Sequence, residues 1–234
     1  IFISHEHSDH VSGLSAIVQK YKIPVYINAG TLREVRGKRL RAFVQLTVHH
    51  QPVRVGGLEI TPFPKKHDAR DPHSFIVRFL QTTVGIFTDI GQPCDQVVHY
   101  FRQCHAAFLE ANYDEEMLMN GKYPWFLKNR IRGGNGHLSN LQALELFKNH
   151  RSASLSHLLL SHLSKENNSP ELVHSLFKSN ESNTQEAIAS RYEESQVYTV
   201  SFAAVADNYQ PGSCAGTVSK KGNTEPVLEQ LRLF

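Results

Sequence analysis

The stretch ISHEHSDHVSG, residues 3–13, places three histidines and one aspartate within six positions, directly after a short apolar run. Side chains two residues apart in an extended chain face the same side, so His5, His7 and Asp9 are expected to converge. His10 follows at the turn into a predicted helix. Imidazole and carboxylate groups together suit zinc or another borderline divalent ion. One ion cannot easily take all four groups from so short a segment, so the pattern predicts two adjacent ions. The density of these groups directly after an apolar run argues against a chance surface cluster.

The composition is that of a globular chain without a strong charge bias. The chain has 234 residues, of which 40% are hydrophobic, and its formal net charge is +3. That charge is too small to indicate a nucleic-acid partner by itself. The three cysteines, Cys94, Cys104 and Cys214, form no recognisable disulfide framework, which favours a reducing compartment and hence the cytoplasm. No apolar run approaches the length of a membrane span, so no membrane association is expected.

The order of elements indicates a layered α/β or α+β fold. Residues 43–88 contain short apolar-rich runs bounded by glycine, proline and polar clusters, which is typical of β-strands. Helices and strands alternate after this stretch, with strands predicted at residues 106–110 and 155–160. Helices are predicted at residues 13–21, 31–35, 95–102, 115–120, 125–130 and 139–147, and from Pro170 onward.

The chain is expected to form a single domain over residues 1–234, because no repeat or linker divides it. Two polar stretches, residues 178–196 and 207–226, are predicted to be loose or loop-like. Ser139 is placed to cap the helix that follows it, with Leu141 on the apolar face of that helix.

The sequence HEHSDH, preceded by an apolar strand and followed by a helix, closely resembles the HxHxDH signature of the metallo-β-lactamase fold. The resemblance implies an αβ/βα four-layer sandwich with a dinuclear metal site at one edge between two sheets. Several strands precede the signature in that family, so the chain is expected to be truncated at its amino end and less stable than its parent.

The same resemblance implies three further ligands, each at the end of a strand. His67 matches the third histidine better than His73, which lies closer to the next strand. Asp89 ends the apolar run VGIFTD and resembles the bridging aspartate, and His162 ends LSHLLLSH and resembles the last histidine. One ion would then be held by His5, His7 and His67, the other by Asp9, His10 and His162, with Asp89 bridging them. Zn²⁺ fits these ligands best, and Mn²⁺ or Fe²⁺ can fill the same site.

Paired cations acidify a water or hydroxide between them, and this provides a nucleophile without a serine or cysteine. Asp9 is expected to orient that water. Glu110, at a strand end, and His137, before a helix, resemble residues of the phosphodiesterase side of the superfamily, which includes the tRNA 3′-processing endonucleases. By that resemblance His137 protonates or stabilises the leaving oxygen and Glu110 orients His137.

Several motifs in order, among them HDARDP, LEANYD, GHLSN and LSHLSKENNSPEL, look like the YycJ/WalJ group of bacterial metallo-β-lactamase-fold proteins. The likeness covers residue 1 to about residue 175. It implies a DNA exonuclease, with DNA favoured over RNA as substrate. His73 and Ser74 depart from the group, which is expected to have a small apolar residue and a glycine there. That change is predicted to alter the wall of the pocket without touching the ligands.

Two other functions remain open from the sequence. The same site suits a thioesterase, lactonase or lactam hydrolase, and the chain is also compatible with a non-catalytic metal-binding scaffold. Basic stretches such as RGKRLR and KNRIRGG can contact phosphates, although solvated surface charge explains any one arginine equally well. Residues 123–125 (Tyr-Pro-Trp) are expected to form a packed loop rather than a base-stacking edge.

Overall fold

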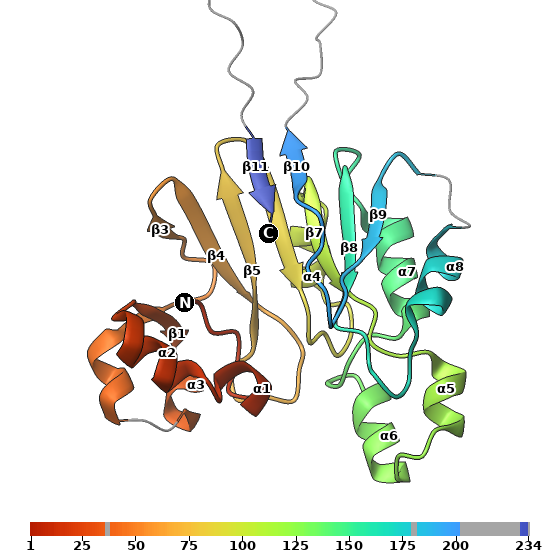
Figure 1. The fold of residues 1–234 in the computed structure, drawn as a ribbon, viewed down its shortest axis with the longest axis horizontal. Helices are drawn as coiled ribbons and strands as arrows, with labels where there is room; N and C mark the ends of the chain where they lie inside the picture. Colours follow the sequence, from red (N-terminus) through yellow and green to blue (C-terminus); the bar gives the residue numbers. More distant parts are fainter. Residues whose placement is uncertain (36–37, 179–181, 202–229, 234) are drawn as a thin grey trace, which may run out of the picture.

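A seven-stranded mixed sheet forms the centre of the computed structural model, which describes residues 1–35, 38–178, 182–201 and 230–233 (Figure 1). The order across the sheet follows the chain, from β3 to β9. Strands β3 to β6 pair antiparallel and β6 to β9 pair parallel. The strands are β3 (Val53–Val55), β4 (Leu58–Pro64), β5 (His73–Phe79), β6 (Thr82–Phe87), β7 (Ala106–Glu110), β8 (His157–Ser161) and β9 (Gln185–Ile188).

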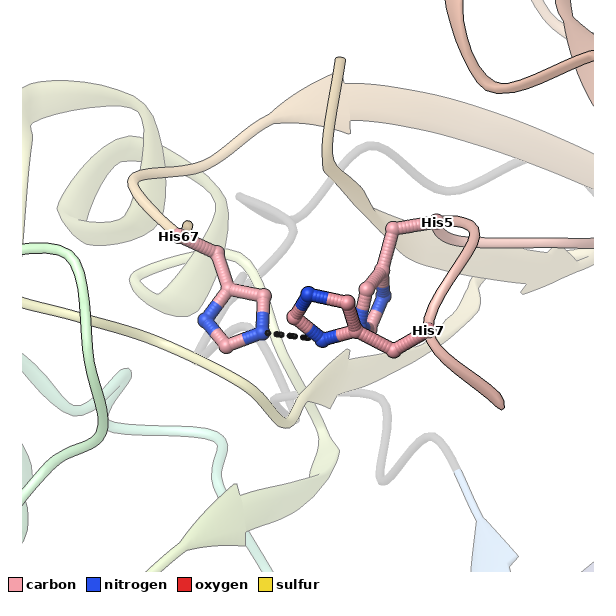
Figure 2. Close-up of side chains that lie close together, drawn as sticks. All are labelled: His5, His7 and His67. Atoms are coloured by element: carbon pink, nitrogen blue, oxygen red, sulfur yellow. Dashed lines mark hydrogen bonds between the residues drawn. The ribbon is translucent and has the colours of Figure 1, made fainter. Parts of the chain in front are cut away.

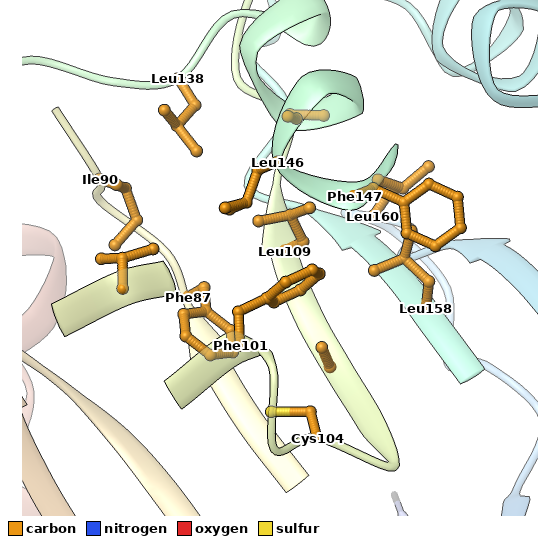
Figure 3. Packing of buried hydrophobic residues seen from close by; sticks show 14 of the residues in the cluster. Phe87, Ile90, Phe101, Cys104, Leu109, Leu138, Leu146, Phe147, Leu158 and Leu160 are labelled. Atoms are coloured by element: carbon orange, nitrogen blue, oxygen red, sulfur yellow. The ribbon is translucent and has the colours of Figure 1, made fainter. Parts of the chain in front are cut away.

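Helices cover one face of the parallel half of the sheet, because parallel strands need crossover connections. These helices are α4 (Asp95–Phe101), α7 (Asn140–His150) and α8 (Pro170–Lys178). Phe101 and Phe147 point from helices α4 and α7 into the main core, where they meet Leu109 and Leu160 from the strands (Figure 3). The carboxyl ends of parallel strands share one edge of the sheet, so Asp89, Glu110 and His162 are brought to the same place.

The amino-terminal segment forms a second, smaller core. Strands β1 (Val25–Asn28) and β2 (Val44–Thr47) pair parallel, and α1 (Ser8–Val11), α2 (Leu14–Tyr21), α3 (Ala29–Glu34) and the 3₁₀ helix η1 (Lys38–Phe43) accompany them. Ile3, Val18 and Ile27 are buried together there. The strand predicted at the start of the chain is present only as a bridge between Phe2 and Tyr26.

Two helices and a pair of strands complete the described part of the chain. α5 (Glu115–Asn120) and α6 (Trp125–Arg132) lie below the sheet, at the lower right of Figure 1. β10 (Tyr198–Ser201) and β11 (Gln230–Leu233) pair antiparallel in front of the sheet. Val200 of β10 packs against Val84 and Ala106, so β10 covers part of the face opposite the helices. The arrangement confirms the predicted mixed α/β class.

Three local predictions differ from the structure. Strand β9 lies inside residues 178–196, where a loose chain was expected, because its backbone pairs with β8. Leu141 is 51% exposed, although Ser139 does cap α7 with a full capping box. Trp125 is 59% exposed instead of packed, with Arg132 over its ring. The second stretch predicted to be loose, residues 207–226, lies outside the described residues.

Candidate metal centre

Three histidines from two distant segments converge at the edge of the sheet (Figure 2). His5 and His7 come from the loop before α1, and His67 from the loop between β4 and β5. His7 Nδ1 lies 3.0 Å from His5 Nε2 and 3.3 Å from His67 Nε2. Tetrahedral ligands about 2.0–2.1 Å from a zinc ion are roughly 3.3 Å apart. The three nitrogens therefore have the spacing of ligands to one ion.

The outer nitrogens of these histidines have partners of their own. His67 Nδ1 is placed to donate to the Gly136 carbonyl at 3.0 Å, and His7 Nε2 to the Asp68 carbonyl at 3.2 Å. Such outer hydrogen bonds fix the tautomer so that the inner nitrogen presents its lone pair. Burial and the nearby Lys65 ammonium lower the pKa of His67 to about 4. The ring is therefore neutral at physiological pH, as a metal ligand must be.

Asp89 lies between the remaining ligands. Its Oδ1 is 3.6 Å from His162 Nε2 and its Oδ2 is 3.5 Å from His10 Nε2. Burial alone would raise the pKa of Asp89, but His10, Lys65 and His162 hold it well below its usual range. Oδ2 is buried and makes no hydrogen bond within the described residues. A buried carboxylate oxygen that accepts no hydrogen bond is costly, so this atom fits a site for a divalent cation.

Glu110 supports the centre from behind. Its Oε1 accepts from His137 Nδ1 and from His162 Nδ1, each at 2.7 Å, and its Oε2 accepts from the Ile90 amide at 2.7 Å. Glu110 is fully buried. Burial would lower the pKa of His162, but Glu110 and Asp89 raise it to about 9. The predicted pair of Glu110 and His137 is in contact, and the link from Glu110 to His162 is one that sequence reasoning missed.

One predicted ligand lies apart from the others. Helix α1 begins at Ser8, so the alternation expected from an extended chain holds for His5 and His7 and ends before Asp9. The Asp9 side chain is 67% exposed, with Oδ2 3.6 Å from His10 Nε2. Three clusters with ligand spacing occur in the described residues: His5, His7 and His67; His5, His10 and Asp89; and Asp89, Glu110, His137 and His162. Asp9 is in none of them, so it lies at the rim.

His73, the competitor of His67, is turned away from the centre. It is fully buried and its Nδ1 lies 2.9 Å from the Asn28 side-chain amide, which donates to it. His73 thus joins the end of β1 to the start of β5. The backbone amide of His73 also donates to the Ser4 carbonyl at 3.1 Å, which ties the loop carrying His5 to the main sheet.

Lys65 is a residue of the centre that sequence reasoning missed. Its side chain is 1% exposed, and its Nζ lies 3.9 Å from Asp89 Oδ2. Burial lowers the pKa of Lys65 to about 8, against the attraction of Asp89 and Glu110. The sequence shows only two adjacent lysines before His67. Successive side chains of a strand face opposite sides, so which lysine turns inward depends on where the strand ends. The sequence alone therefore could not single out either lysine.

A cavity of about 700 Å³ opens in front of the ligands. His137 and His162 lie in its wall with Tyr123, and the cationic side chains Arg130, Lys165 and Arg191 also line it. A second cavity of about 590 Å³ is lined by the same segment from His162 to Lys165 and by Arg191, so the two cavities are neighbours. Arg191 is held there because its guanidinium donates to the Leu163 carbonyl at 2.7 Å. The centre therefore faces a groove with positive charge.

No helix in the described part of the chain has both the length and the apolar character needed to cross a membrane.

Residues 1–162 match the family model described as Beta-lactamase superfamily domain. The chain is 31% identical over 176 residues to exodeoxyribonuclease YycJ of Bacillus anthracis, a match covering 74% of this chain and 67% of that protein. It is 33% identical over 181 residues to exodeoxyribonuclease WalJ of Streptococcus pneumoniae, covering 74% and 66%. The chain thus spans about two thirds of the length of these relatives.

Solved structures resemble the fold. The metallo-beta-lactamase fold protein YhfI of Bacillus subtilis superposes with a TM-score of 0.58 at 18% identity, over 80% of this chain and 73% of that one. A diphosphatase of the PhnP family superposes with a TM-score of 0.55 at 20% identity, over 80% and 67%. At these identities the likeness concerns the fold alone.

Proposed function

The chain belongs to the beta-lactamase superfamily, and on this premise we propose that it is a phosphodiesterase that hydrolyses DNA with two divalent metal ions. The observation that carries the proposal is the carboxylate of Glu110, which bonds both His137 and His162 at 2.7 Å. Both histidines belong to the cluster that contains Asp89, and both line the open cavity. The relatives named exodeoxyribonuclease support the choice of substrate.

The proposed ligands are His5, His7 and His67 for one ion and His10 and His162 for the other, with Asp89 between them. When bound, the ions supply Lewis-acid activation of water and charge stabilisation at the phosphate. Zn²⁺ suits the nitrogen-rich set, and Mn²⁺ or Fe²⁺ is also compatible with it.

The side chains around the ligands have separate roles in this proposal. His137 Nδ1 is engaged with Glu110, so Nε2 is the atom available to give a proton to the leaving oxygen. Glu110 orients that ring by accepting the hydrogen bond from Nδ1. Asp9, at the rim, is left to bind and orient water rather than to hold an ion. Arg130, Lys165 and Arg191 line the groove and are suited to phosphate contacts along a DNA strand.

The test uses bis(p-nitrophenyl) phosphate and end-labelled duplex DNA, single-stranded DNA and structured RNA, with Zn²⁺ or Mn²⁺ added. We expect turnover of the diester and shortening of duplex DNA from its ends. Asp89→Ala should lower both activities by about 10²–10³-fold or more, because charge stabilisation at the phosphate is lost. Asp95→Ala, which removes an exposed carboxylate at the start of α4, is the matched control.

Turnover of a thioester, lactone or chromogenic lactam in place of the diester would contradict the proposal. So would a protein that binds metal stoichiometrically and cleaves none of these compounds, because that result identifies a metal-binding scaffold.

A further inference from the structure

Lys65 places a cation behind the metal centre, inside the protein. It directly follows β4, and its Nζ donates to the Thr88 carbonyl at 2.7 Å. The same nitrogen lies 3.9 Å from Asp89 Oδ2. This is the carboxylate oxygen that faces His10 Nε2 at 3.5 Å. Lys65 and His10 therefore approach one oxygen of Asp89, while His162 approaches the other.

The burial of this ammonium needs an explanation. A charged group removed from water costs several kcal/mol unless it is paired. A neutral donor would serve the Thr88 carbonyl equally well, so that hydrogen bond does not account for a charge. Asp89, and more distantly Glu110, are the anions that act on Lys65. The partner that requires a positive charge is thus the Asp89 carboxylate.

We propose that Lys65 is a positioning residue that acts as a built-in counter-ion of Asp89. In the metal-free fold its ammonium balances the buried carboxylate. When a divalent ion binds, it must share Asp89 Oδ2 with that ammonium, and like charges in a poorly screened interior repel strongly. Lys65 therefore lowers the affinity of the ion bound on the His10 side and makes the two metal positions unequal.

Metal affinity is measured without any substrate, so the test of Lys65 does not depend on the proposed hydrolysis. Metal-free protein would be titrated with Zn²⁺ at neutral pH in competition with a chromophoric chelator. The wild type should bind two ions with distinct affinities. Lys65→Met should bind the weaker ion about tenfold more tightly or better, because the repulsion is gone. Lys66→Met, a change of the same charge at an exposed neighbour, should bind both ions as the wild type does.

Thermal melting gives a second readout. The difference in Tm between metal-loaded and metal-free protein should be wider for Lys65→Met than for the wild type, because tighter binding stabilises the folded state further. Lys65→Gln keeps a donor for the Thr88 carbonyl and removes the charge. It is expected to behave like Lys65→Met, and it carries the test if the methionine variant does not fold.

Two results would overturn the inference. Equal or weaker zinc binding by Lys65→Met and Lys65→Gln would show that Lys65 only anchors the strand end. A wild type that binds no zinc, or two ions of equal affinity, would also exclude the proposed role.

Discussion

At the scale of single residues, Glu110 connects His162, a proposed metal ligand, to His137, the proposed proton donor. One of its oxygens accepts from two histidines and the other from the backbone amides of Ile90 and Leu138. In Glu110→Gln, one carboxylate oxygen is replaced by an amide nitrogen. In either orientation of the side chain, that nitrogen faces hydrogen-bond donors and cannot accept from them. We expect a fall of about 10- to 100-fold in metal affinity or kcat.

Chelator competition and steady-state kinetics on the diester would measure the two effects. Glu145→Gln, on the exposed side of α7, is the matched control and should leave both unchanged. A Glu110→Gln protein with wild-type affinity and wild-type kcat would show that the two histidines do not depend on the carboxylate.

The residues of the centre differ in how far the sequence predicts them. His5, His67, Asp89 and His162 each follow an apolar run in the sequence, and the structure brings them close together. Lys65 was not predicted, because an inward lysine has the same sequence context as its outward neighbour. Asp9 was expected to converge with the histidines, and the start of α1 directs it to the rim.

At the scale of elements, the loop between α6 and α7 positions two histidines at once. Gly136 offers its carbonyl to His67 and is followed directly by His137. A Cβ at Gly136 would lie 2.0 Å from the Ile131 carbonyl oxygen, which is backbone and cannot give way easily. Gly136→Ala is therefore expected to displace the loop, at a cost of about 1–3 kcal/mol in the free energy of unfolding, and to weaken zinc binding.

Urea denaturation and zinc stoichiometry would check this expectation. Gly13→Ala is the comparison, because a Cβ there meets nothing closer than 3.8 Å. Unchanged zinc binding by Gly136→Ala would mean that the carbonyl contact to His67 is dispensable.

Helices and strands with local signals were predicted well from the sequence. Strand β7 and helix α5 have the predicted bounds, and Ser139 caps its helix as expected. Strand β9 was missed because its polar sequence has little strand character of its own. It exists through pairing with β8, which is a long-range effect that no local pattern reveals.

At the scale of the whole molecule, the centre joins two hydrophobic cores. His5 and His7 belong to the segment around the small amino-terminal core, whereas His67, Asp89 and His162 extend from the main sheet. Bound metal stabilises the folded state by about 2.7 kcal/mol at a free concentration one hundred times Kd. We expect removal of the metal by a chelator to destabilise the small amino-terminal core more than the main sheet.

Hydrogen exchange followed by mass spectrometry would test this. On addition of a chelator, peptides covering α1 and α2 should lose protection before those covering β6 to β8. Simultaneous loss of protection in both regions would contradict the idea that metal joins two separately packed units.

The proposed ligands also become available in a fixed order in time, because the chain is synthesised from residue 1 toward residue 234. During synthesis His5 and His7 leave the ribosome first, and His162 emerges only after β8 has been made. A nascent chain cannot complete the centre before that point. If the proposed ions bind, a complete centre would mark a polypeptide translated through β8, and prematurely terminated products would lack it.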